Sequence, residues 1–237
     1  MFYFDPVYML ISVVGMILVF APQMLVKNTF AKFSKVRATR GLTGAQVAKS
    51  LLENAGVYDV RIESTTGTLS DHYDPSKKVV RLSEEIYHGD SVAAFGIAAH
   101  EVGHAIQDYQ GNIPMRLRSG ILPAVQAGQT IGPLLLMAGL GLRYFTHLGE
   151  LSTLIALAGI ALYGSVVLFH FITLPVELNA SHKAMKALAG GGYFVGNEIN
   201  GARKVLTAAA LTYVAVALYA LIELLYWVWV LFGRNRD

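Results

Sequence analysis

Four apolar stretches constrain the fold of this 237-residue chain more than any other feature. They cover residues 7–26, 119–142, 151–174 and 205–232, and each reaches the roughly 20 residues that a helix needs to cross a bilayer. One such stretch could be a buried helix of a soluble protein. Four of them, with a mean hydropathy of +0.47 and only 15% charged residues, predict a multi-pass membrane protein.

The segment His100-Glu101-Val102-Gly103-His104 has the spacing H-E-x-x-H. Histidines four residues apart lie on one face of a helix, so both imidazoles can bind the same zinc ion. Glu101 points in another direction, where it can take a proton from a zinc-bound water. The motif therefore predicts His100 and His104 as metal ligands and Glu101 as the catalytic general base.

The surrounding residues favour the helix that this chemistry requires. Residues 90–107 place apolar side chains at helical spacing, and Asp90 or Ser91 can cap the start of the helix. Gly96 and Gly103 remove side chains from the helix surface. Space for a substrate and close packing of a second helix explain these glycines equally well.

A catalytic zinc site needs a third protein ligand and an open position. After His104 the chain crosses the membrane twice and returns to the same side at Pro175, where we expect a further helix to begin. Glu177 then reaches the membrane face that carries the motif, and it is the favoured third ligand. Candidates to stabilise the oxyanion are Arg203, Tyr193, His182 and His72.

A small region of mixed structure precedes the motif. Thr43 and Gln46 have the spacing of a capping box, and a helix over residues 45–54 follows them. Short strands are expected at residues 60–63, 67–73 and 78–83. Residues 79–82 are a candidate edge strand that could hold an extended substrate, although an ordinary structural hairpin explains them equally well.

Residues 100–107, together with residues 175–181, resemble the bacterial membrane neutral zinc metallopeptidase family of YugP-like proteins. The resemblance covers nearly the whole chain, and the layout is distantly similar to that of HtpX and the CAAX prenyl proteases. It implies a gluzincin-type zinc-dependent endopeptidase. In two positions the chain departs from the pattern, because Ser181 stands where many gluzincins have an aspartate that orients a zinc histidine, and Asn179 also replaces an expected acid.

The basic residues near the spans predict the orientation of the chain. Eleven lie in residues 27–118 and 175–204, and three lie on the other side. The eleven are Lys27, Lys32, Lys35, Arg37, Arg40, Arg116, Arg118, Lys183, Lys186, Arg203 and Lys204; the three are Arg143, Arg234 and Arg236. An excess of Lys and Arg marks cytoplasmic loops, so the motif is predicted to face the cytoplasm.

The predicted fold class is a mainly α multi-pass membrane protein with four transmembrane helices and a small α+β, zincin-like catalytic region. Residues 1–27 form an uncleaved transmembrane anchor, 28–118 the cytoplasmic α+β region with the motif, and 119–174 two transmembrane helices. Residues 175–204 form the cytoplasmic segment with the third ligand, and 205–237 the last transmembrane helix and tail.

The predicted function is Zn²⁺-dependent hydrolysis of membrane-associated or unfolded polypeptides at the cytoplasmic face of the cell (inner) membrane. The expected partners are a polypeptide substrate and the lipid bilayer, without nucleic acid; a homo-oligomer is left open. The alternative is a non-hydrolytic zinc-binding scaffold or metal transporter, for which His170 and Glu223 are the suggestive intramembrane groups. A site-2-type intramembrane protease fits less well, because its motif lies within a span.

Overall fold

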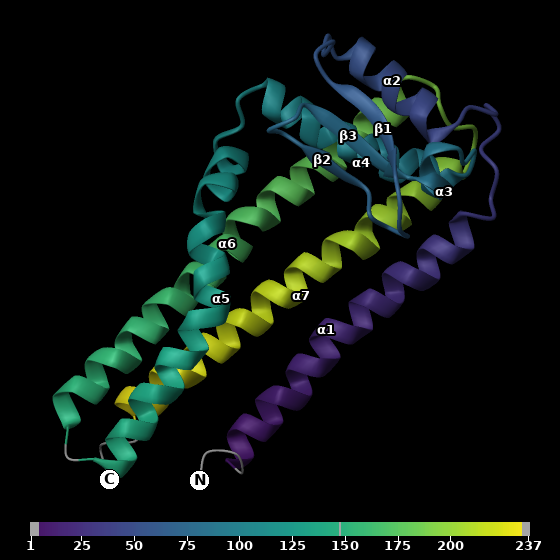
Figure 1. The fold of residues 1–237 in the computed structure, drawn as a ribbon. Helices are drawn as coiled ribbons and strands as arrows, with labels where there is room; N and C mark the ends of the chain where they lie inside the picture. Colours follow the sequence, from purple (N-terminus) through teal and green to yellow (C-terminus); the bar gives the residue numbers. More distant parts are fainter. Residues whose placement is uncertain (1–4, 147, 234–237) are drawn as a thin grey trace. The chain divides into compact units, whose positions relative to one another are not determined.

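The computed structural model describes residues 5–146 and 148–233 (Figure 1). Within these residues, four helices are long and apolar enough to cross a membrane. They are α1 (Pro6–Phe33), α5 (Ile113–Phe145), α6 (Gly149–Gly190) and α7 (Glu198–Phe232). With a small three-stranded sheet, they confirm the predicted fold class.

The helix that carries Glu177 differs from our expectation. We predicted a new helix at Pro175, but α6 is a single 42-residue helix that continues through this proline. Proline in a helix interior removes one backbone hydrogen bond and usually costs stability, so the sequence pattern suggested a boundary. The consequence is that Glu177 lies on the same continuous helix as the third apolar stretch.

The chain folds into two compact units, each assembled from segments that are distant in the sequence. The helical unit comprises Met1–Phe20, Leu117–Leu174 and Tyr213–Asp237, and the mixed unit comprises Ala21–Arg116 and Pro175–Thr212. The five-segment division of the sequence stays a prediction.

Glycines allow α5 and α6 to approach closely within the helical unit. A Cβ atom at Gly139 would lie 2.5 Å from the Ala156 nitrogen, and one at Gly159 would lie 2.5 Å from the Leu136 nitrogen. Small residues at helix contacts are typical of transmembrane helices, where association depends on close packing.

The mixed unit contains the sheet, which has the strand order β1-β3-β2. Strand β1 (Arg61–Thr65) is parallel to β3 (Val79–Ser83), and β2 (His72–Asp74) is antiparallel to it. The candidate edge over residues 79–82 is therefore wrong, because β3 is the central strand. A hairpin with a parallel third strand was not predictable from residue alternation alone.

Three further helices complete the mixed unit: α2 (Gly44–Asn54), α3 (Glu84–Tyr87) and α4 (Val92–Tyr109). Both hydrogen bonds of the predicted capping box at Thr43 and Gln46 are present. Figure 1 shows α2, α3 and α4 gathered around the sheet. Their apolar faces and strand β3 share one core, which includes Val47, Leu51, Leu82, Phe95 and Val102.

Candidate active site

Helix α4 carries the H-E-x-x-H motif and starts as its sequence indicates. The Ser91 hydroxyl accepts a hydrogen bond from the Ala94 backbone N–H at 3.1 Å, while Asp90 instead pairs with Arg37. Ser91 is thus the N-cap, and α4 extends over 18 residues.

Both glycines of α4 serve close helix packing. A Cβ atom at Gly103 would lie 2.6 Å from the Ala180 carbonyl oxygen on α6, and one at Gly96 would lie 3.3 Å from the Ala202 Cβ on α7. The glycine next to His104 therefore lets α4 lie directly against α6, which brings the motif close to Glu177.

Glu177 lies between the two histidines of the motif. Its Oε2 is 3.2 Å from His100 Nε2 and 3.3 Å from His104 Nε2, and its side chain is buried. One ligand atom from each of the three residues lies within 4.8 Å of the others. Among the residues that the structure describes, this is the one group of three or more such side chains that could hold a metal ion.

The other ring nitrogen of each histidine is held by a polar neighbour. His100 Nδ1 lies 3.1 Å from Ser181 Oγ, and His104 Nδ1 lies 3.0 Å from Gln107 Oε1. When each Nδ1–H donates to these oxygens, each Nε2 keeps its lone pair for a metal. The Gln107 oxygen, which can only accept, favours this tautomer for His104, and the Ser181 hydroxyl, which can donate or accept, is compatible with it for His100.

Gln107 is fully buried, and its orientation is fixed by two further bonds. Its Nε2 donates to the Val176 carbonyl at 2.8 Å and to Asn179 Oδ1 at 2.9 Å. Its Oε1 must therefore face His104 and accept from it. Asn179 and Ser181 are the two departures from the gluzincin pattern. Ser181 contacts His100 directly, and Asn179 orients His104 through Gln107, in both cases with an uncharged oxygen.

The donor set and its spacing fit a zinc ion. Two imidazole nitrogens and one carboxylate oxygen are common zinc ligands, and atoms about 2.0–2.2 Å from a tetrahedral zinc lie about 3.3–3.6 Å apart. The two distances from Glu177 Oε2 are close to that separation. That these residues bind zinc stays a prediction.

Glu101 is almost completely buried, at 8% exposure. Burial raises the pKa of Glu101 to about 7; His100 opposes this shift, and the negative charges of Glu177 and Asp71 add to it. The backbone N–H of Tyr73 on β2 donates to Glu101. A carboxyl group with a pKa near neutrality suits a residue that takes up and later releases a proton.

A model of the family described as "Putative neutral zinc metallopeptidase" matches residues 8–232. The chain belongs to this family. It is also similar to the "Putative membrane protease YugP" of Bacillus subtilis (strain 168), with 45% identity over 230 residues, which cover 97% of this chain and 98% of that protein. No solved structure matches the chain significantly. The predicted family and enzyme class are confirmed, and the family description implies zinc as the metal.

The four candidate oxyanion residues of this metallopeptidase have different surroundings. The Tyr193 hydroxyl is engaged by Ser50 at 2.6 Å and by Asn54 at 3.1 Å. His72 contacts the Ser70 carbonyl and Arg81 through its two ring nitrogens. His182 and Arg203 instead line one groove between α6 and α7.

Sequence reasoning missed Gln107 as a partner of the metallopeptidase site. Its position three residues after His104 places both on one helical face, and that spacing was the available signal. It also missed the attachment of β2 to α4, where the Tyr73 hydroxyl donates to Asp108 at 2.7 Å and Lys78 pairs with the same carboxylate at 2.6 Å. No sequence pattern indicates these contacts, because they join distant segments.

Proposed function

We propose that this metallopeptidase cleaves membrane-associated or unfolded polypeptides near the cytoplasmic face of the cell membrane, with zinc held by His100, His104 and Glu177. The observation that carries the proposal is the convergence of two Nε2 atoms and Glu177 Oε2, with both Nδ1 atoms held from outside. This arrangement leaves three lone pairs directed at one point.

Bound zinc supplies a Lewis acid that lowers the pKa of a water molecule toward 7 and polarises the scissile carbonyl. Glu101 accepts the proton of the attacking water and then delivers it to the leaving amine. Burial raises the pKa of Glu101, which favours uptake of that proton. Ser181 Oγ and Gln107 Oε1 lie within hydrogen-bond distance of the Nδ1 atoms of His100 and His104 and orient the two rings.

Strand β2 is the edge of the sheet that lies beside Glu101, through the Tyr73 backbone. An extended substrate can add to a sheet edge through main-chain hydrogen bonds, which do not depend on the substrate sequence. β2 therefore replaces β3 as the strand that we expect to align the substrate.

The decisive experiment compares the full-length protein with Glu101→Gln, and with Glu53→Gln as an exposed control. We expect Glu101→Gln to retain one zinc per chain and to lose at least about 100-fold of its cleavage of an unfolded protein, because general-base catalysis contributes at least that much. Glu53→Gln should behave like the parent. Near-normal cleavage by Glu101→Gln would refute the proposed role.

The cytoplasmic orientation rests on the asymmetry of basic residues, eleven against three. The chain has no cysteine, so single cysteines can be introduced cleanly. A cysteine replacing Ser76 should react with an impermeant thiol reagent only after the cells are permeabilised, and one replacing Glu150 should react in intact cells. Glu150 lies in the first turn of α6, and His147 lies outside the described residues. Labelling at position 76 in intact cells would reverse the orientation.

A further inference from the structure

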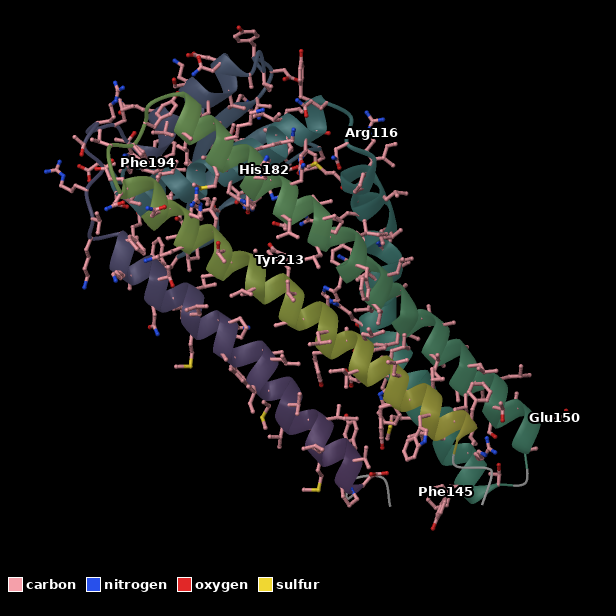
Figure 2. The ribbon with its side chains drawn as sticks, turned by 180° about the vertical axis from the view of Figure 1, so that it is seen from behind. Arg116, Phe145, Glu150, His182, Phe194 and Tyr213 are labelled. Carbon is pink, nitrogen blue, oxygen red and sulfur yellow. The ribbon has the colours of Figure 1, made fainter. Side chains whose placement is uncertain are left out.

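The edge strand β2 is attached to α4 at two points. The Tyr73 backbone N–H donates to Glu101, and the Tyr73 hydroxyl donates to Asp108 Oδ2 at 2.7 Å. Asp108 follows Glu101 by seven residues, so both lie on one face of α4, about 10 Å apart along the helix. The second point is therefore near the end of α4, shortly before Arg116 in the first turn of α5, which is labelled in Figure 2.

Lys78 completes the second attachment. Its Nζ lies 2.6 Å from Asp108 Oδ2, so the ammonium and the Tyr73 hydroxyl both donate to one carboxylate oxygen. Tyr73 is buried, and the Asp108 side chain is only 18% exposed. Charge-assisted hydrogen bonds in such a partly shielded place hold their partners better than ion pairs on the open surface do. We call Tyr73, Lys78 and Asp108 the clasp.

The backbone of Lys78 is in an unfavourable conformation. Its φ is +51°, in the left-handed region that glycine and asparagine adopt more readily than lysine. The turn before it is organised by Asp74, whose Oδ1 accepts from the backbone N–H groups of Ser76 and Lys77. Glycine at position 78 would relieve the strain but would remove the ammonium from Asp108. Strained residues of this kind are concentrated where function requires the side chain.

We propose that Lys78 and Asp108 are positioning residues for peptide cleavage: through Tyr73, the clasp keeps β2 in place beside Glu101, ready to receive an extended substrate. The inference rests on the proposed peptidase function and on the alignment of the substrate along β2. It gives a role to two side chains outside the group of candidate metal ligands.

The second attachment is needed because the first one changes during the reaction. Glu101 shares its carboxylate with the attacking water and then carries a proton, so it accepts the Tyr73 N–H less strongly during part of each cycle. Asp108 lies two helical turns away and takes no part in the proton transfer. The clasp is thus the attachment that persists. A strand held in this way is already ordered when the substrate arrives, which lowers the entropic cost of binding.

The test compares Lys78→Gly with Lys77→Gly in the purified full-length protein in neutral detergent. Lys78→Gly removes the ammonium and relieves the strain, whereas Lys77→Gly places the same flexible residue in the same turn at an exposed lysine. We expect KM for an unfolded polypeptide to be about 10-fold higher in Lys78→Gly, because ordering even one backbone residue on binding costs about that factor. Its kcat should change less than its KM.

Thermal unfolding separates positioning from stability. Lys78→Gly should unfold at the same temperature as Lys77→Gly or at a higher one, because its glycine occupies the left-handed position. A purely structural role therefore predicts that Lys78→Gly is the more active of the two, and the clasp predicts that it is the less active. If activity follows the unfolding temperature in these variants, the proposal is overturned.

Two further variants test the clasp itself. Lys78→Arg keeps a cation for Asp108 and should stay within about 2-fold of the parent KM. Tyr73→Phe should raise KM as Lys78→Gly does, and it decides the question if Lys78→Gly fails to fold. The two changes combined should raise KM by less than the product of their separate effects, because both act on Asp108. Independent effects would contradict a shared role.

Binding separates this inference from the function on which it rests. Fluorescence anisotropy of a labelled unfolded peptide with Glu101→Gln protein, with and without Lys78→Gly, reports binding along β2 without turnover. Weaker binding in the Lys78→Gly protein, with no cleavage by the parent, would overturn the proposed hydrolysis and support the clasp. Equal KM and equal binding in the Lys78→Gly and Lys77→Gly proteins, with an active parent, would overturn the clasp alone.

Discussion

Two carboxylates on long apolar helices have opposite surroundings. Glu177 on α6 belongs to the mixed unit, and its Oε2 lies 3.2–3.3 Å from two imidazole nitrogens. Glu223 on α7 belongs to the helical unit, and its Oε2 accepts a hydrogen bond from the Tyr163 hydroxyl at 2.7 Å. Glu223 also lines a cavity of about 250 Å³ with Trp227 and Tyr8.

The comparison shows that the neighbours of an acid on an apolar helix decide what it can bind. The imidazoles around Glu177 can direct lone pairs at a shared cation, since their Nδ1 protons point elsewhere. The Tyr163 hydroxyl at Glu223 instead directs an O–H at the carboxylate, which is a hydrogen-bond donor and no metal ligand partner. An acid in an apolar helix is thus insufficient evidence for a pathway that conducts metal ions. Among the described residues, Glu223 does not belong to a group of side chains that could hold a metal ion, so it does not support the transporter alternative.

The sharpest contrast comes from removing each carboxylate charge. In Glu177→Gln, zinc affinity and peptide cleavage should each fall more than about 100-fold. Loss of a residue that only hydrogen-bonds a metal ligand costs up to about 100-fold, and this variant replaces a ligand itself. Glu223→Gln should keep one zinc per chain and measurable cleavage. Metal content of the purified proteins and peptide hydrolysis check both. Full zinc occupancy in Glu177→Gln would remove Glu177 from the site.

The neighbours of Glu177 could be predicted from the sequence, and those of Glu223 could not, for a physical reason. His100, Glu101 and His104 follow from helical geometry over five residues, and Glu177 follows from span topology, which is coarse but sufficient to predict that Glu177 lies near the motif, as the structure has it. The partner of Glu223 was not predictable, because Tyr163 lies 60 residues away on another helix.

The sheet shows the same limit of sequence reasoning. Its strands were located by alternation and turn residues, but their order was not, because strand pairing depends on contacts between segments that are distant in the chain. The capping box of α2 and the Ser91 cap of α4 depend on residues three apart, and both sites could be read from the sequence.

The second prediction concerns the amide that orients His104. Gln107→Met removes its hydrogen bonds at similar volume and should weaken zinc binding about 10- to 100-fold, as loss of an outer partner of a metal histidine commonly does. Competition with a zinc chelator measures the affinity. Gln110→Met is the control, because Gln110 is exposed and accepts from Lys183 at 2.7 Å away from the histidines. Equal affinities of the two variants would contradict the assignment.

A smaller effect is expected at Ser181, which orients the more exposed histidine. Ser181→Ala should weaken zinc binding only a few-fold, toward the lower end of the roughly 10- to 100-fold range or below it. Ser181→Asp should strengthen it, because a charged acceptor binds the Nδ1–H more strongly than a hydroxyl does. The same chelator competition decides the sign. A weaker site in Ser181→Asp would show that the neutral oxygen is required.

The smallest effect on the metal site is expected from Tyr163→Phe, which removes the donor to Glu223 and leaves the mixed unit unchanged. Hydrogen bonds between transmembrane helices contribute about 0.6 kcal/mol on average and rarely more than about 2, so the free energy of unfolding in detergent should fall within that range. Zinc content and peptide cleavage should equal those of the parent and of Tyr144→Phe, a control at an exposed tyrosine of α5. Loss of zinc in Tyr163→Phe would mean that the two carboxylates are coupled, and that the Glu223 environment supports the chemistry at Glu177 as well as the packing of its own helices.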